Sequence, residues 1–133
     1  MSIDQSLVGQ EFPPTAPLPV PVERIREFAS AIGAEYAGGP APATFPTVLA
    51  IAAMNTFLAA TGLDLSRVVH GDQKFTYARP VLPGDVLTAS LTVASLRQIG
   101  GNDIIGTRSD VTDAAGRLVC TATATLVHRG GEA

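Results

Sequence analysis

The chain has 133 residues, of which 46% are hydrophobic and 16% are charged, and its formal net charge is −3. This length is enough to bury one core, and the low charge content favours burial of surface against a partner. The weak negative charge, without a basic run, excludes the electrostatic surface of a nucleic-acid-binding protein. We therefore expect one domain over residues 1–133.

The first part of the chain is predicted to be an extended segment followed by a helix. Residues 13–21 contain five of the ten prolines, which forbids a helix and favours an edge strand. In residues 22–32 apolar side chains recur every three or four positions, the period of an amphipathic helix. Gly33 is a typical stop for such a helix.

A second, longer helix is predicted from Pro46, where a proline is tolerated in the first turn, to about residue 60. Gly62 is expected to end it. Its residues are apolar on nearly every side, which is typical of a helix enclosed by other structure. We expect it to be the central helix of the fold.

The rest of the chain has the two-residue period of β-strands, with turn residues between the segments. We expect four strands in an antiparallel meander, at residues 68–77, 86–97, 103–113 and 117–128. A meander that wraps one long apolar helix is an α+β architecture, the hot-dog fold. Such a sheet leaves an exposed edge, so we expect the chain to form a homodimer or a heterodimer.

Three segments carry a resemblance to a known family. Residues 41–46 read APATFP, residues 70–77 read HGDQKFTY and residues 79–87 read RPVLPGDVL. In order and spacing they resemble the helix entry, the following strand and the R-P-x-x-x-G-D-x-L turn of N-terminal MaoC-like hot-dog dehydratases. The chain is most similar to the non-catalytic, substrate-binding subunits of mycobacterial (3R)-hydroxyacyl-ACP dehydratases.

The resemblance implies chemistry that this chain does not supply. MaoC-like enzymes use an Asp and a His, in a D-x-N-P-x-H pattern after the first helix, as acid and base on the acyl thioester. Here residues 33–40 read GAEYAGGP, with Ala34 about where the Asp would stand and no His. We therefore assign no catalytic residue. Residues 33–45 are also too few for the usual overhang of the family, so a partner is expected to complete the acyl tunnel.

The substrate-binding residues that we predict are Thr44, Phe45, His70 and Gly71. Thr44 and the backbone amides at the start of the central helix are candidate donors to a thioester carbonyl, because a helix N-terminus presents unpaired N–H groups. His70 and Gly71 open a strand, where an imidazole can lie beside a dimer seam or a pocket mouth. A lone histidine without a companion acid or nucleophile is more often structural, and this alternative stays open.

Other polar residues receive structural interpretations. Glu35 and His128 are expected to be solvated, and Asp72 and Asp85 to flank turns and bond the local backbone. Cys120 is expected to be a buried, inert thiol. The two histidines are distant in sequence and have no carboxylate at ligand spacing, so we expect no metal and no other cofactor. Isolated arginines that could hold a phosphate or an acidic carrier are Arg67, Arg79, Arg97 and Arg108.

Three functions are consistent with these residues. The first is a substrate-binding subunit of an enoyl- or 3-hydroxyacyl-thioester (CoA or ACP) hydratase or dehydratase in fatty-acid metabolism, active only with a MaoC-like catalytic partner. The second is a hot-dog thioesterase in which Glu35 or Asp72 activates water on an acyl-CoA. The third is a homodimer that binds an acyl ligand without chemistry.

The start of the chain and its apolar stretches predict where in the cell the protein is found. The first ten residues lack the basic and then apolar pattern of a secretory signal. The longest apolar stretch, residues 47–60, is shorter than the roughly 20 residues that cross a bilayer. We expect a cytoplasmic protein without a membrane span.

Overall fold

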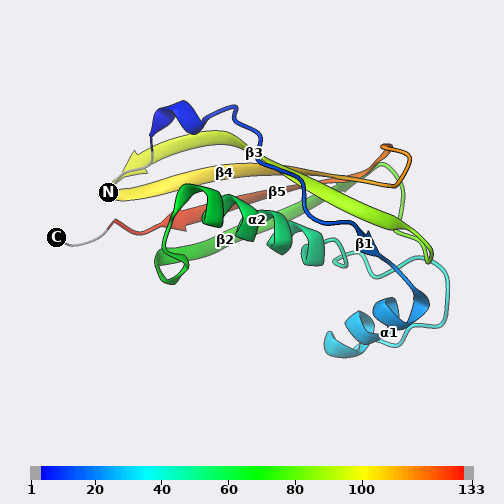
Figure 1. Ribbon diagram of the computed structural model, residues 1–133. Helices are drawn as coiled ribbons and strands as arrows, with labels where there is room; N and C mark the ends of the chain where they lie inside the picture. Colours follow the sequence, from blue (N-terminus) through cyan, green and yellow to red (C-terminus); the bar gives the residue numbers. More distant parts are fainter. Residues whose placement is uncertain (1–3, 131–133) are drawn as a thin grey trace.

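The computed structural model describes residues 4–130, which form an antiparallel sheet curved around one long helix (Figure 1). The strands are β1 (Leu18–Pro19), β2 (Val68–Tyr77), β3 (Val86–Ile99), β4 (Asn102–Thr112) and β5 (Leu118–His128). Their order in the sheet is β1-β3-β4-β5-β2. The helices are α1 (Val22–Ala31) and α2 (Thr47–Thr61), with short 3-10 turns at Gln5–Leu7 and Leu65–Arg67. This is the α+β hot-dog architecture that the sequence predicts.

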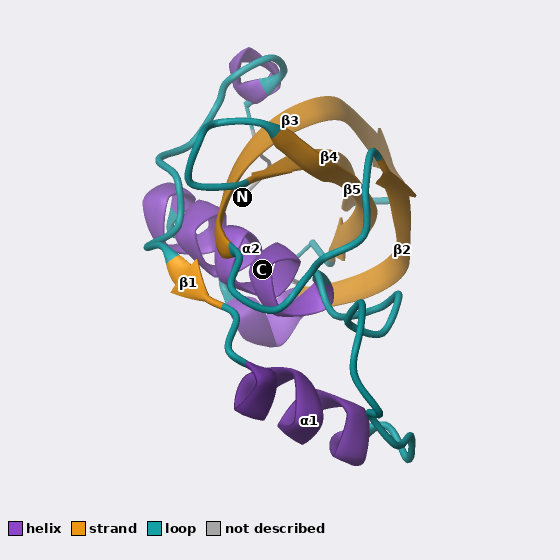
Figure 2. Cartoon of the chain, turned by 90° about the vertical axis from the view of Figure 1, so that its right-hand side faces the viewer, coloured by secondary structure: helices purple, strands orange, loops and turns teal. Residues whose placement is uncertain are grey.

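The core lies between α2 and the concave side of the sheet, which curls around the helix in Figure 2. Leu49, Ala53 and Phe57 of α2 are buried, and every second residue over much of β3 and β4 is buried as well. Phe57 meets Phe12 edge to face, with ring centroids 5.0 Å apart. A fully buried side chain of this size contributes about 1.5 to 3 kcal/mol. Burial of α2 is therefore a main source of stability.

The opposite side of α2 is left partly uncovered. Asn55, Ala59 and Ala60 are exposed, and Ile51 and Met54 are half-buried. The prediction of an enclosed helix thus holds for one side only of α2 within this chain. Apolar surface on the other side is available for contact with another molecule.

Gly62 ends α2, as predicted from the sequence. Its φ of 72° lies in the left-handed region that favours glycine, and its amide donates to the carbonyl of Leu58 over 2.9 Å. The chain then turns back into β2. Within residues 4–130, no helix combines the length and the apolar character needed to cross a lipid bilayer.

Helix α1 lies apart from the sheet, below the entry to α2 in Figure 2. Ile25 and Ala29 are its buried residues. Phe28 packs edge to face on Phe45, with ring centroids 5.3 Å apart. This aromatic contact fastens α1 to the turn that leads into α2.

The prediction that His128 is solvated is wrong. This residue is only 6% exposed. Strand β5 continues to His128, and the register places it between Asp103 of β4 and Val68 of β2. Its imidazole lies against the buried carboxylate of Asp103, and a position near the end of the chain gives no sign of that burial.

Candidate functional site

A pocket of about 400 Å³ lies at the entry to α2. One wall is the loop that carries Ala41 and Ala43. The other wall is formed by Tyr77, Ala78, Arg79, Pro80 and Val81, at the end of β2 and just beyond it. The pocket therefore brings together residues from all three segments that carry the family resemblance.

Two hydrogen bonds join the walls of this pocket. The amide of Ala41 donates to the carbonyl of Val81 over 2.9 Å, and the hydroxyl of Tyr77 donates to the carbonyl of Ala43. Burial, and then the neighbouring Cys120 thiol, raise the pKa of Tyr77 to about 12. The phenol therefore stays protonated at neutral pH and keeps its proton to donate.

Arg79 organises the turn beside the pocket and does not present a free charge. Its Nη1 and Nη2 lie 2.9 and 3.1 Å from the two carboxylate oxygens of Asp85, and Nη2 lies 3.1 Å from Oδ2 of Asp113. Bidentate pairing of this kind is strong and directional. Because its donors serve protein carboxylates, Arg79 is not available to hold a phosphate, a role that the sequence left open.

Asp85 bonds the backbone of the same turn, as predicted. Its Oδ2 accepts from the amide of Leu82 over 2.9 Å, and Gly84 has a φ of 92°, which favours glycine. Burial opposes ionisation of Asp85, but the hydrogen bonds from Arg79 and Leu82 outweigh it, so the pKa of the carboxyl lies below its usual value. The R-P-x-x-x-G-D motif of this chain is a structural turn.

The first backbone amides of α2 already donate hydrogen bonds within the chain. Those of Thr47 and Val48 donate to the carbonyls of Thr44 and Phe45 over 3.0 and 3.1 Å. The amides of Ala43 and Thr44 have no acceptor within residues 4–130. The unpaired donors therefore lie in the loop just before α2, beside the pocket, where Thr44 is exposed.

Phe45, one of the predicted substrate-binding residues, is fully buried. Its ring packs edge to face on Phe28 of α1. Contact between this side chain and a substrate would require the core to open. The structure thus gives Phe45 a packing role next to the pocket.

His70 and Gly71 lie on β2, well away from the pocket. They are roughly 20 Å along the strand from Tyr77, at about 3.3 Å per residue. Nε2 of His70 lies 3.0 Å from Oε1 of Gln73. A Cβ at Gly71 would lie 3.2 Å from the carbonyl oxygen of Thr125, so the glycine permits close approach to β5. The structure does not bring all four predicted residues to one site.

Sequence reasoning missed Tyr77 as a site residue. The residue ends the segment 70–77 that carries part of the resemblance, but its local sequence does not show a contact with Ala43. The direction of its side chain follows from the pairing of β2 with β5, which places Tyr77 opposite Cys120. Cys120 is buried as expected, and burial, followed by the Asp110 carboxylate, raises the pKa of its thiol to about 11. Such a thiol is unreactive at neutral pH.

The carboxylates considered for hydrolysis do not line the pocket. Glu35 and Asp72 are both exposed, and Glu35 is solvated as expected. Asp72 lies inside β2 and not beside a turn, contrary to the prediction, because the strand continues through a bulge between His70 and Asp72. In the part of the chain that the structure describes, no three His, Cys, Asp or Glu side chains form a group that could hold a metal ion.

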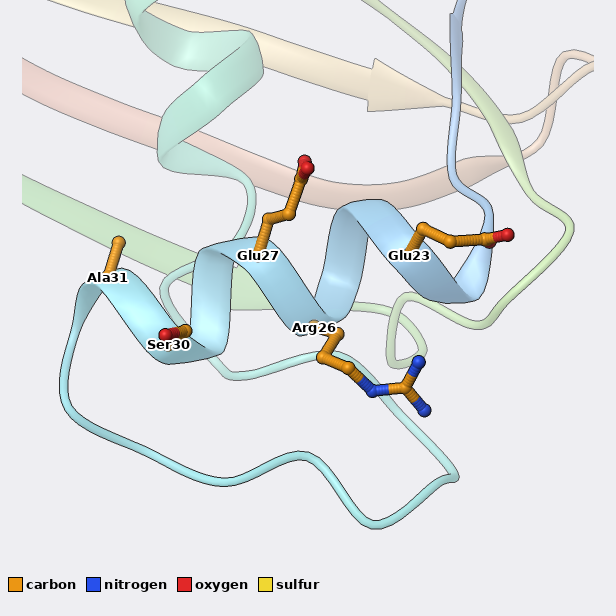
Figure 3. A pocket seen from close by; sticks show the side chains of 5 residues that line it. All are labelled: Glu23, Arg26, Glu27, Ser30 and Ala31. Atoms are coloured by element: carbon orange, nitrogen blue, oxygen red, sulfur yellow. The ribbon is translucent and has the colours of Figure 1, made fainter.

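A second hollow, of about 520 Å³, lies along α1 (Figure 3). Its lining residues are Glu23, Arg26, Glu27, Ser30 and Ala31. All five belong to one helix, and the side chains of Arg26 and Glu27 point in different directions in Figure 3. Because no second element lines this hollow, it does not gather groups for a reaction.

Comparison with known proteins identifies the family. Residues 6–122 match the family model described as FAS1-like, dehydratase domain region. The chain belongs to this dehydratase family. The FAS1-like domain is 31% identical to a chain of the C-terminally truncated HadBC (3R-hydroxyacyl-ACP dehydratase) complex of Mycobacterium tuberculosis. That match has a TM-score of 0.79 and covers 91% of this chain and 96% of that chain.

A solved structure named as a MaoC-like dehydratase is also similar to this FAS1-like domain. It is 25% identical, with a TM-score of 0.77, over 96% of this chain and 43% of that chain. The resemblance to MaoC-like hot-dog dehydratases is therefore confirmed.

Two relatives of this FAS1-like domain are named only as UPF0336 proteins. One, from Streptomyces coelicolor, is 46% identical over 148 aligned positions that cover 99% of each chain. The other, from Clavibacter michiganensis subsp. michiganensis, is 43% identical over 149 positions that cover 100% of each chain. Both alignments are longer than the 133 residues of this chain, so these relatives contain segments that it lacks.

Proposed function

We propose that this chain is the substrate-binding subunit of an enoyl- or 3-hydroxyacyl-thioester hydratase or dehydratase, acting on CoA or ACP substrates in cytoplasmic fatty-acid metabolism. A MaoC-like partner would supply the Asp and His that perform the reaction. One observation carries the proposal: the titratable side chains that line the pocket at the entry to α2 are Tyr77 and Arg79.

Neither group suits acid–base chemistry near neutral pH. Burial, and then the Cys120 thiol, raise the pKa of Tyr77 to about 12. The hydrogen bonds that Arg79 donates to Asp85, and then to Asp113, raise its pKa further above its already high value. A general acid or base works best when its pKa lies near the operating pH. Proton transfer at the substrate would therefore need groups from another chain.

The same pocket has features suited to binding. The unpaired amides of Ala43 and Thr44 lie beside it and can donate to a thioester oxygen. Ala41, Ala43 and Val81 give its walls an apolar character that suits the carbon atoms next to the thioester. In this proposal the acyl chain continues along the partly uncovered side of α2.

The free edge of β2 is the proposed contact with the partner. Strand β2 pairs with β5 on one side and lies at the end of the strand order, and an edge strand of ten residues needs a cover. Asp72 and Lys74 are two residues apart and share one face of the strand. In an antiparallel pair of two such strands centred on Gln73, Asp72 of each lies opposite Lys74 of the other.

The two neighbouring registers are less favourable for this edge. Centres at Asp72 or at Lys74 would place like charges opposite each other, which destabilises a strand pair. A family member with the same alternation of charges in its edge strand would therefore be complementary to β2. The HadBC structure, to which this chain is similar, is a complex, and this supports assembly with a second chain.

Hydration of crotonyl-CoA tests the proposal. The chain is assayed alone and after mixing with a MaoC-like partner that has an intact D-x-N-P-x-H motif, by the loss of absorbance of the conjugated thioester. Activity in the mixture, but in neither chain alone, is expected. Activity of this chain by itself would refute the proposal, and a mixture no more active than the partner alone would do the same.

The two alternative functions have less support. The carboxylates required for a thioesterase, Glu35 or Asp72, lie outside the pocket. An acyl-binding homodimer without chemistry would retain the pocket and the β2 edge, but would not activate a partner. The assay of the mixture therefore separates it from the subunit proposal.

A further inference from the structure

We propose that Tyr77 is a positioning residue: by holding the loop before α2 against the end of β2, it sets the width of the pocket and its affinity for an acyl thioester. The statement about affinity rests on the proposed function. The statement about the loop does not, because it follows from the hydrogen bonds of this chain alone.

The hydroxyl of Tyr77 is placed to control one wall of the pocket. The loop wall carries Ala41 and Ala43, and the facing wall runs from Tyr77 to Val81. The amide of Ala41 is bonded to Val81 at one end of these walls, and the Tyr77 hydroxyl is bonded to Ala43 nearer α2. Within residues 4–130, the bond from Tyr77 to Ala43 is the one side-chain hydrogen bond that joins the two walls.

The loop has little else to hold Ala43 in place. The amide of Phe45 donates to the carbonyl of Pro42 over 2.9 Å, and that of Thr47 donates to Thr44 over 3.0 Å, so both of these bonds stay inside the loop and its junction with α2. Ala43 itself is exposed. Without the Tyr77 hydroxyl, the segment around Ala43 is restrained only by its two ends.

The hydrogen bond of Tyr77 also restrains the groups that are proposed to bind the thioester. The unpaired amides belong to Ala43, which accepts the Tyr77 bond, and to Thr44, which follows it. Preorganised donors bind an oxygen better than mobile ones, because less motion is lost on binding. Tyr77 thus acts through its neighbours and need not touch the substrate. Tyr77 is partly exposed, but the burial of the rest of its side chain raises the pKa of the phenol to about 12, so the phenol keeps its proton across the pH range of an ordinary assay.

Tyr77→Phe tests this role, because it removes one oxygen and keeps the ring. The matched control is Tyr36→Phe. Tyr36 also donates to a backbone carbonyl, that of Gly39, but it does not line the pocket. Thermal unfolding of both variants shows whether the fold is retained.

Hydrogen exchange of the amides of Phe45 and Thr47 measures the loop directly. We expect exchange to be about fivefold faster in Tyr77→Phe, the factor that corresponds to loss of one ordinary hydrogen bond, and unchanged in Tyr36→Phe. Equal exchange rates in Tyr77→Phe and the wild type would overturn the inference, whatever the activity. An equal increase in the control variant would also overturn it.

Kinetics with the catalytic partner measure the effect on the substrate. For crotonyl-CoA we expect KM to rise about fivefold in Tyr77→Phe, with kcat within about twofold of the wild type. A loss of kcat without a change in KM would contradict a positioning role. If the wild-type mixture is inactive, the proposed function fails and the thioester part of the inference fails with it, while the exchange experiment still decides whether Tyr77 holds the loop.

Discussion

Nδ1 of His128 lies 3.3 Å from Oδ2 of Asp103, and both side chains are buried at the opposite end of the sheet from the pocket. Nε2 of Gln98 donates to the other oxygen of Asp103 over 3.0 Å. The three residues come from β5, β4 and β3 and lie at matched positions in the sheet. They form a polar row at this end of the sheet.

His128→Ala is expected to destabilise the protein by about 2 kcal/mol, because Oδ2 of the buried Asp103 loses its partner and only the Gln98 bond to the other oxygen remains. Urea denaturation at pH 7 measures the free energy of unfolding. His70→Ala is the control, since His70 is exposed, and its expected effect is below about 0.5 kcal/mol. Equal losses in the two variants would show that the Asp103–His128 pair contributes no more than a surface contact.

Arg79→Met is expected to reduce stability by about 1 to 2 kcal/mol at pH 7, since the lost pairs are charge-assisted but partly exposed. The effect should depend on pH. The pKa of Asp85 lies below its usual value in the folded protein. Its stabilising contribution is therefore complete above the unfolded pKa, about 3.9, and is lost as the pH falls through the lower folded pKa.

Urea denaturation of the wild type and of Arg79→Met at several pH values from 7 to 2.5 checks this dependence. The difference in free energy of unfolding should stay constant above about pH 5 and shrink below about pH 4. Arg24→Met, on the exposed side of α1, serves as the control. A difference that grows as the pH falls would contradict the assigned sign.

Asp72→Lys is expected to weaken assembly with the MaoC-like partner about tenfold in Kd. The substitution replaces an attractive cross-strand charge pair by a repulsive one, a change of about 1 to 1.5 kcal/mol. Analytical ultracentrifugation at low and at high salt measures the Kd, and the difference should narrow at high salt because exposed charges are screened. Glu23→Lys makes the same change of charge on exposed α1 and should leave the Kd unchanged. Equal Kd values for Asp72→Lys and the wild type would rule out the β2 edge as the contact surface.

Much of the fold could be predicted from the sequence because its signals are local. The helix predicted for residues 22–32 is α1 (Val22–Ala31), and the predicted strand 68–77 has the observed bounds of β2. The stop at Gly62 follows from the left-handed conformation that glycine adopts there. Each of these features depends on residues within one or two turns of the chain.

The candidate site was less predictable, since it depends on contacts between distant residues. Thr44 was predicted from its place before the central helix, but the unpaired amides of Ala43 and Thr44 belong to the loop and not to α2. Tyr77 was missed, because its partner Ala43 is 34 residues away. The separation of His70 from the pocket could not be predicted either, because it depends on the direction and length of β2.

The sequence by itself determined the order of helices and strands, the family motifs and the lack of the D-x-N-P-x-H pattern, because periodicity and residue type are written along the chain. Only the tertiary structure decided which side chains meet. The pairing of β2 with β5 and the curl of the sheet around α2 bring Tyr77 to Ala43, and β4 and β5 together bury His128 against Asp103. Such contacts arise from sheet register and burial, which join residues from distant parts of the chain.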